Sequence, residues 1–154
     1  MSSLAGPVAV AELELEFPPR PEFVRTARHT VSALARLHEL SDQMVEDLKL
    51  AVSEACTNAV TENAKQQSAE PVLLRVHRDG SSLLVEVLDR GPGLDPSLID
   101  RDAELDSQEF SFEKGLSLPL IRGLVEDLSL TPRDGGGTVV TMRVAADPGP
   151  SGLD

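Results

Sequence analysis

The sequence predicts an α/β two-layer sandwich, in which a mixed, mostly antiparallel sheet is covered on one face by helices. Three observations predict it: an alternating apolar and polar run near the N-terminus, two later hairpin signals, and three segments whose apolar residues recur at helical spacing. A hairpin places consecutive strands side by side and antiparallel, and a helix with one apolar stripe buries that stripe against a sheet. The predicted order is β, α, α, β, β, long loop, α, β, β.

The N-terminal part of the chain is predicted to form one strand and two helices. The strand comprises residues 8–17, VAVAELELEF, and the two prolines that follow end it. Apolar residues then recur at helical spacing over residues 22–40. Ser41 or Asp42 is expected to cap a second helix that continues to about Ala64.

The C-terminal part is predicted to contain two hairpins, separated by a long loop and a helix. Residues 72–91 hold two β-rich runs around Asp79-Gly80, a turn that requires positive φ. Residues 90–113 have no periodicity, and so long a connection in a compact domain is usually functional or disordered. Helical spacing returns over residues 115–128, and the last hairpin is expected to turn at residues 134–137.

Length and charge limit the class of protein. A chain of 154 residues is expected to form one domain, here residues 1–146, followed by a disordered tail at 147–154 that has no core residues to order it. The 14 Lys and Arg against 26 Asp and Glu give a formal net charge of -12. This charge disfavours direct binding to nucleic acid or to an anionic membrane, and we expect neither as a partner.

The cysteine content and the hydropathy pattern indicate the compartment. Cys56 is the only cysteine, so no internal disulfide can form and a reducing compartment is the simpler assumption. Its place on the apolar stripe of the second helix predicts core packing. No apolar run approaches the roughly twenty residues of a membrane span, and the N-terminus lacks the residue order of a secretory signal. We therefore expect a cytoplasmic protein.

The stretch EACTNAVTEN, residues 54–63, places two carboxylates and an amide on one side of the second helix. Glu54, Asn58 and Glu62 share this side because residues four apart lie on the same helix face. The amide oxygen of Asn58 suits Mg²⁺, which takes a few protein oxygens together with water and phosphate oxygens. Such a face needs a partner or a ligand.

Two glycine-containing stretches add further candidate binding groups. Asp89 follows a predicted strand, and its carboxylate can accept a hydrogen bond from an exocyclic amine such as that of adenine. Gly91 and Gly93 permit close backbone approach or positive φ, and Gly115 exposes N–H groups that suit a phosphate at a helix start. Each feature alone is weak, since a D-x-G-x-G stretch is more often a plain turn and a helical glutamate is usually solvated.

Together and in this order, four stretches resemble a known family. AVSEACTNAV, LDRGPGLD, GLSLPLIRGLVEDL and GGGTVVTM are similar to the ATP-binding domain shared by gyrase-type ATPases, sensor histidine kinases and anti-sigma-factor serine kinases. The closest resemblance is to the last group, the RsbW-like kinases. It extends from the first strand to about Val144 and implies the histidine-kinase-like ATP-binding fold.

The resemblance also implies a role for each matching position. It implies that Asn58 coordinates a magnesium ion that bridges the phosphates of ATP, and that Glu54 is the general base. Asp89 would hold the adenine amine. The base and ribose pocket would be completed by Gly91, Gly93 and Thr138. The lid over the phosphates would contain Lys114, Gly115, Leu116 and Ser117.

In function, the resemblance implies an ATP-dependent serine/threonine protein kinase that is also an anti-sigma factor. It would sequester a sigma factor, phosphorylate a STAS-type anti-sigma-factor antagonist and form a homodimer, with ATP and Mg²⁺ as cofactors. Two other functions stay open. One is a sigma-factor-binding module, with or without bound nucleotide and with little or no kinase activity; the other is a stand-alone ATPase.

Two positions depart from the family pattern. Glu62 stands where members commonly have a histidine, and we interpret this carboxylate as solvated. Glu113 stands where the lid usually has the first glycine of a Gly-x-Gly-Leu run. An acidic residue near the phosphates would hinder lid closure and hence turnover, which favours the binding module.

The three histidines are expected to be structural. His38 lies near a predicted helix end, where its side chain can interact with the last carbonyls. His29 and His77 are isolated from other residues at metal-ligand spacing and are expected at the surface.

Overall fold

The computed structural model describes residues 11–92 and 117–145 of the chain. In chain order, its elements are β1 (Leu13–Phe17), the short 3-10 helix η2 (Pro21–Phe23), α1 (Val24–Leu37), α2 (Asp42–Lys65), β2 (Val72–Asp79), β3 (Ser82–Leu88), α5 (Ser117–Leu124), β4 (Asp127–Pro132) and β5 (Thr138–Ala145). The positions 93–116 and the predicted tail at 147–154 lie outside the described residues.

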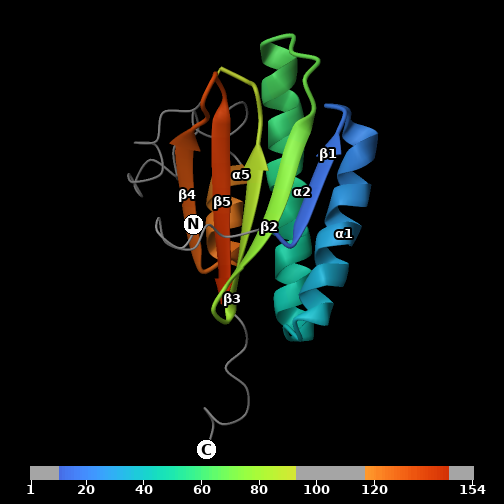
Figure 1. Cartoon of the computed structure of the whole chain (residues 1–154), viewed down its shortest axis with the longest axis vertical. Coiled ribbons are helices and arrows are strands. Elements are labelled where there is room, and N and C mark those ends of the chain that lie inside the picture. The colour runs from blue at the N-terminus through green and yellow to red at the C-terminus, as the bar shows by residue number, and fades with distance from the viewer. Residues whose placement is uncertain (1–10, 93–116, 146–154) are drawn as a thin grey trace, which may run out of the picture.

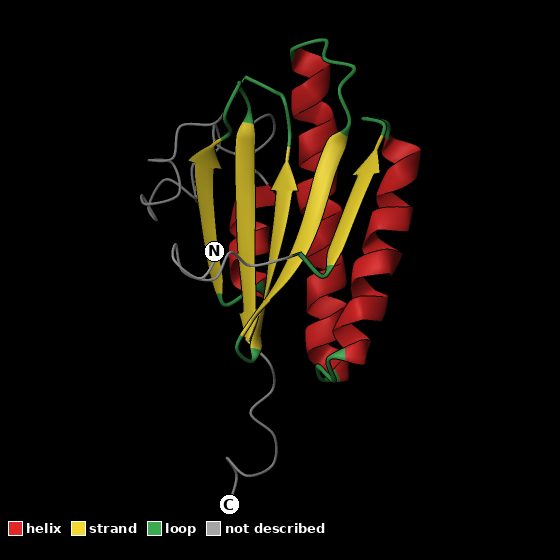
Figure 2. Cartoon of the chain, in the orientation of Figure 1, coloured by secondary structure: helices red, strands yellow, loops and turns green. Residues whose placement is uncertain are grey.

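The five strands form one sheet in the order β1-β2-β3-β5-β4 (Figure 1; Figure 2). Each of the two predicted hairpins supplies an adjacent pair, β2 with β3 and β4 with β5. Pairing of β3 with β5 joins the hairpins, and β1 adds to the free edge of β2. All four pairs are antiparallel, so the predicted two-layer sandwich is confirmed, and the sheet formed by the described strands is antiparallel rather than mixed.

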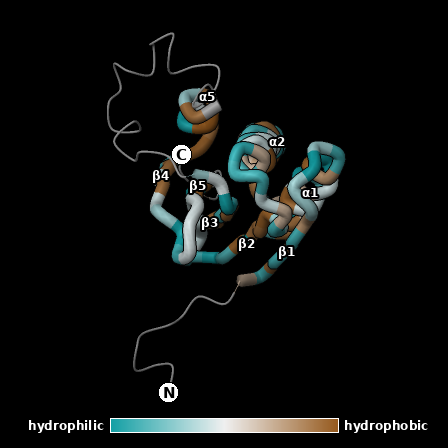
Figure 3. Tube along the Cα trace, turned by 90° about the horizontal axis from the view of Figure 1, so that it is seen from above, coloured by the Kyte–Doolittle hydropathy of each residue, from teal (hydrophilic) through white to brown (hydrophobic). Residues whose placement is uncertain are grey.

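The helices of the described residues cover one face of the sheet, with α2 lying between α1 and α5 (Figure 3). Strand residues alternate accordingly: Val72, Leu74 and Val76 of β2 are fully buried, while the residues between them are half-buried on the open face. Leu48 and Val52 of α2 pack into the same core with no exposed surface. The core therefore lies between the sheet and the central helix.

Local sequence signals set the main boundaries. Ser41, rather than Asp42, caps α2: its hydroxyl oxygen accepts the N–H of Met44 at 3.1 Å. Gly80 has φ +64 in the β2–β3 turn, as the hairpin signal predicts. Cys56 is fully buried, which confirms its core position, and burial raises the pKa of its thiol to about 12.

Two predicted boundaries were wrong. The first strand begins at Leu13, so Ala11 and Glu12 are not part of it as predicted, and the predicted positions 8–10 lie outside the described residues. The last helix ends at Leu124, although its spacing continues to residue 128. Asp127 and Leu128 instead pair with Arg143 and Met142 of β5, because strand pairing outweighs local helical preference at the sheet edge.

The histidines also differ in part from expectation. The ring of His38 pairs with Glu12 (Nε2 to Oε1, 2.6 Å) rather than with the last carbonyls of α1. His77 is half-buried on the open face of the sheet, where its Nε2 lies 2.9 Å from Oε1 of Glu86. His29 is exposed, as predicted. Within the described residues, no helix is both long and apolar enough to cross a membrane.

The alternation of β5 gives a test of the fold. Met142→Ala should lower the free energy of unfolding by about 2–5 kcal/mol, because Met142 is fully buried against the helices and truncation leaves a cavity. Thr141→Ala, on the opposite face of the same strand, should cost less than about 1 kcal/mol. Denaturant titration measures both; equal losses would contradict the assignment of the two faces.

Candidate functional site

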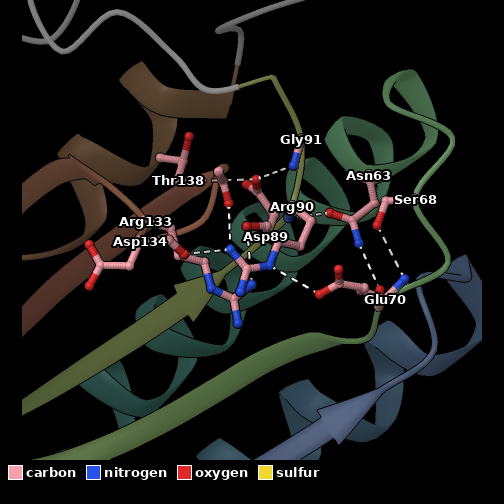
Figure 4. Close-up of polar contacts among 10 residues, drawn as sticks. Asn63, Ser68, Glu70, Asp89, Arg90, Gly91, Arg133, Asp134 and Thr138 are labelled. Carbon is pink, nitrogen blue, oxygen red and sulfur yellow. Dashed lines mark hydrogen bonds and ion pairs between the residues drawn. The ribbon is translucent and has the colours of Figure 1, made fainter.

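Asp89 lies directly after β3, where the backbone leaves the sheet. Its side chain is buried, with 4% of the residue exposed. Oδ1 accepts the N–H of Gly91 at 2.8 Å and the N–H of Thr138 at 3.2 Å (Figure 4). Among the described residues, no hydrogen bond to Oδ2 is formed. The carboxylate is thus fixed by one oxygen and can offer the other to a ligand.

Two glycines allow the backbone around Asp89 to pack this closely. A Cβ at Gly91 would collide with the side chain and backbone of Glu62 at the end of α2. A Cβ at Gly137 would collide with the carbonyl of Asp89, and Gly137 has φ +109, a conformation that favours glycine. The segment after β3 is therefore held between the last turn of α2 and the β4–β5 turn.

Burial dominates the electrostatics of Asp89. Loss of water raises the pKa of its carboxyl, and the nearby carboxylate of Glu62 raises it further. The N–H groups of Gly91 and Thr138 and the guanidinium of Arg133 lower it, but the net direction is upward. The site keeps a carboxylate where its ionised form is disfavoured, which is typical of functional positions.

Glu62 is buried, with 3% of the residue exposed, so our interpretation of this side chain as solvated was wrong. The reason is the close approach of Gly91, whose backbone covers the last turn of α2. The carboxylate of Glu62 is compensated by Lys65, with Nζ 3.0 Å from Oε2. Of the three residues that share the α2 face in the sequence, only Glu54 and Asn58 are half-buried.

Glu54 and Asn58 lie on the flank of α2 that turns away from α1. Ser53 marks the flank facing α1, because its hydroxyl accepts a 3.4 Å hydrogen bond from Arg28. Relative to Ser53, the side chain of Glu54 is rotated about the helix axis by about 100°, and that of Asn58 by about 140°. The helix α5 packs against α2 on that other side (Figure 3). Neither side chain forms a polar contact with another described residue.

The other predicted site residues divide into two groups. Thr138 is buried beside Asp89, and its carbonyl accepts the N–H of Asp89 at 3.0 Å. Ser117 is the first residue of α5. Outside the described residues lie Gly93, Lys114, Gly115 and Leu116, as does Glu113, the position that departs from the family's lid pattern.

The described residues contain no group of three or more His, Cys, Asp or Glu side chains that could hold a metal ion. This does not conflict with Mg²⁺, which is commonly held by one or two protein oxygens together with the phosphates of a substrate. A half-buried amide such as Asn58, with no polar partner within the described chain, fits that donor set.

Comparison with known proteins assigns the chain to a family. The profile described as "Histidine kinase-like ATPase domain" matches residues 17–144. The chain belongs to this family. The resemblance found in the sequence is thereby confirmed, and the match covers every element from the end of β1 to β5.

Several curated relatives are serine-protein kinases. The chain is 32% identical over 139 residues to "Serine-protein kinase RsbW" of Listeria innocua, a match that covers 86% of this chain and 87% of the relative. It is 30% identical over 133 residues to the protein of the same name from Bacillus subtilis, covering 84% of this chain and 83% of the relative.

Solved structures share the fold. One contains the RsbU and RsbW domains of a Mycobacterium tuberculosis protein and superposes with a TM-score of 0.64 at 17% identity, over 87% of this chain and 32% of that one. Another is the SiaB-SiaC complex from Pseudomonas aeruginosa, with a TM-score of 0.59 at 13% identity, over 87% of this chain and 89% of that one.

Two residues of the site were missed in the sequence analysis. Asn63 and Arg90 directly follow Glu62 and Asp89, and they join the segments around Asp89 (Figure 4). An amide at the end of an otherwise apolar helix stripe was the available signal for Asn63. For Arg90, no local pattern distinguishes it from a solvated arginine.

The packing at Gly91 predicts a stability effect. Gly91→Ala should lower the free energy of unfolding by about 1–3 kcal/mol, because the new methyl group has no room against Glu62. Gly123→Ala is the matched control in α5: nothing lies near its added Cβ, and alanine favours a helix by up to about 1 kcal/mol. Equal thermal midpoints for the two variants would contradict this packing.

The raised pKa of Asp89 predicts an unusual pH dependence. A carboxyl whose folded pKa is raised contributes stability below its unfolded pKa, and that contribution is lost as pH rises through the folded value. An amide at this position would stay neutral and keep an oxygen for the two N–H groups. Asp89→Asn should therefore unfold at a denaturant midpoint equal to or above wild type at pH 7, with the difference shrinking in acid. A clear drop in the denaturant midpoint of Asp89→Asn at pH 7, with no such drop in the exposed control Asp134→Asn, would contradict burial as the cause of the raised pKa of Asp89.

Proposed function

We propose that this chain is an ATP-dependent serine/threonine protein kinase and an anti-sigma factor. It sequesters a sigma factor and phosphorylates a STAS-type anti-sigma-factor antagonist. The observation that carries the proposal is Asp89, a buried carboxylate with Oδ1 fixed by two backbone N–H groups and Oδ2 left for a ligand amine. Membership of the ATPase family and relatives named serine-protein kinase support it.

The adenine end of the proposed ATP site is built around Asp89. Its Oδ2 accepts a hydrogen bond from the exocyclic amine of adenine, which distinguishes adenine from a base with an oxygen at that position. Thr138 lies beside this carboxylate, and Gly91 brings the backbone close. The family resemblance assigns Gly93, which lies outside the described residues, to the ribose side of this pocket.

The phosphate end lies along α2 and the start of α5. Asn58 would hold Mg²⁺ through its amide oxygen, and the ion would supply positive charge to the phosphates. The family resemblance assigns Ser117, and Lys114, Gly115 and Leu116 outside the described residues, to a lid over these phosphates. The lysine supplies positive charge, and the start of α5 supplies backbone N–H groups.

Glu54 is the proposed general base. It accepts the proton of the substrate Ser or Thr hydroxyl as that oxygen attacks the γ-phosphorus and the bond to the β–γ bridging oxygen breaks, which releases ADP. Its half-buried place without a described polar partner leaves it available for this proton.

The partners and setting follow from the same proposal. The sigma factor and the antagonist are both proteins, in line with a net charge of -12 that disfavours direct contact with nucleic acid. We place the protein in the cytoplasm as a homodimer. A sigma-factor-binding module without kinase activity is less favoured, because the curated relatives are named as kinases.

A phosphoryl-transfer assay with the purified antagonist and labelled ATP tests the proposal. Glu54→Gln should lower the transfer rate by about 10²–10⁴-fold, the usual contribution of a general base, while calorimetry shows unchanged ATP affinity. Glu46→Gln, on the α1 flank of α2, is the matched control and should transfer normally.

Calorimetry separates the metal role from the base role. Asn58→Ala should keep ATP binding without Mg²⁺ and lose the gain in affinity that Mg²⁺ gives the wild type. Wild-type protein that binds ATP but never phosphorylates the antagonist would refute the kinase and leave the binding module. Failure of the wild type to bind ATP at all would refute both the kinase and a binding module that depends on nucleotide.

A further inference from the structure

Arg90 joins three separate segments of the site. Its Nε donates to Oε1 of Glu70 at 3.1 Å, and its Nη1 donates to the carbonyls of Asp134 at 2.6 Å and Gly136 at 2.7 Å (Figure 4). The side chain is 23% exposed. An arginine committed to one carboxylate and two carbonyls is not a solvated surface residue.

Asn63 fixes the backbone of the same residue from the opposite side. It has no exposed surface, and its Oδ1 accepts the N–H of Arg90 at 2.6 Å. Its Nδ2 donates to the carbonyl of Glu70 at 2.9 Å. Asn63, Glu70 and Arg90 therefore form a closed set of contacts that ties the end of β3 to the last turn of α2 and to the start of β2.

Arg90 contacts the β4–β5 turn, whose backbone is rich in glycine and gains most from added contacts. Gly135, Gly136 and Gly137 follow one another with φ +87, +110 and +109, and a run of glycines has much conformational freedom to lose. The next residue is Thr138, whose N–H donates to Oδ1 of Asp89. If the turn moves, that donor moves with it.

We infer that Arg90 and Asn63 are positioning residues that hold the Asp89 carboxylate in the orientation in which Oδ2 meets the adenine amine. Arg90 orders the glycine turn that carries one donor to Oδ1, and Asn63 fixes the backbone that leads to the other donor, Gly91. The inference rests on the proposed ATP site. It adds that discrimination for adenine depends on two residues that do not contact the base.

Binding of two nucleotides tests this. For Arg90→Ala, affinity for ATP should fall about tenfold, the loss expected for one hydrogen bond to a charged group, whereas affinity for purine riboside triphosphate, which lacks the amine, should stay near wild type. At saturating ATP the kcat should persist while KM rises. Arg143→Ala, which removes an arginine paired with Asp79 at 2.8 Å at the far end of the sheet, is the matched control and should change neither affinity.

Two further variants keep the test decisive. Arg90→Lys retains the charge but cannot make the forked contact, so it should show the same selective loss if the alanine variant fails to fold. Combining Arg90→Ala with Asp89→Asn should add nothing to the loss of Asp89→Asn alone, because both act on one hydrogen bond. Equal loss for ATP and the analogue would overturn the inference and leave Arg90 with a general structural role.

Hydrogen exchange at single amides gives a readout that needs no nucleotide. In Arg90→Ala or Arg90→Lys, the amides of Gly91 and Thr138 should exchange faster than in wild type, while core amides of β2 keep their rates. Unchanged exchange at both amides would overturn the inference even if ATP binds as proposed. Equal affinity of the wild type for ATP and the analogue would instead refute adenine recognition by Asp89. That result would be a failure of the proposed function, and the exchange rates would still show separately whether Arg90 orders the two amides.

Discussion

The close approach of residues 89–91 to the last turn of α2 is the contact on which the site depends. It requires a glycine at position 91, because any side chain there would meet Glu62, and it requires Asn63, whose amide oxygen accepts the N–H of Arg90 inside the core. The same approach buries Asp89 and turns its Oδ1 toward two backbone donors. Moving the segment outward would lose the burial, the hydrogen bonds and the orientation together.

The burial of carboxylates in this arrangement costs stability, although one of them serves the proposed function. Asp89 and Glu62 are both buried, and burial together with the nearby carboxylate of Glu62 raises the pKa of Asp89. Compensation comes from Lys65 beside Glu62 and from the guanidinium of Arg133, which donates to the carbonyl of Asp89 at 3.2 Å. Burial and the neighbouring Arg90 lower the pKa of Arg133 without making it neutral at physiological pH. Carboxyl groups with perturbed pKa values gather at functional sites, which supports the choice of this region as the candidate site.

Much of the fold was predictable because its signals are local. The Asp79-Gly80 turn, the cap at Ser41 and the α2 stripe each act within a few residues, and each occurs where expected. The burial of Glu62 and the contacts of Arg90 were not predictable, because their causes lie far along the chain: the backbone of Gly91 for one, and the turn at residues 134–137 for the other. Helical spacing placed Glu62 beside Glu54 and Asn58, but only the packing of another segment decides which side chain of a face reaches solvent.

The helix α2 connects the two ends of the proposed ATP site as a rigid spacer. Asn63 fixes the adenine end, and Asn58 lies five residues earlier, which corresponds to about 7.5 Å along the helix axis. A further turn back lies Glu54, so the inferred positioning residue Asn63, the proposed metal ligand Asn58 and the proposed general base Glu54 follow one another along a single helix. Since the same helix is packed into the core at Leu48 and Val52, these separations are set by the fold and not by loops. A nucleotide held at Asp89 would therefore present its γ-phosphoryl group at a fixed place beside Glu54, which is what phosphoryl transfer requires of a protein that works chiefly by positioning.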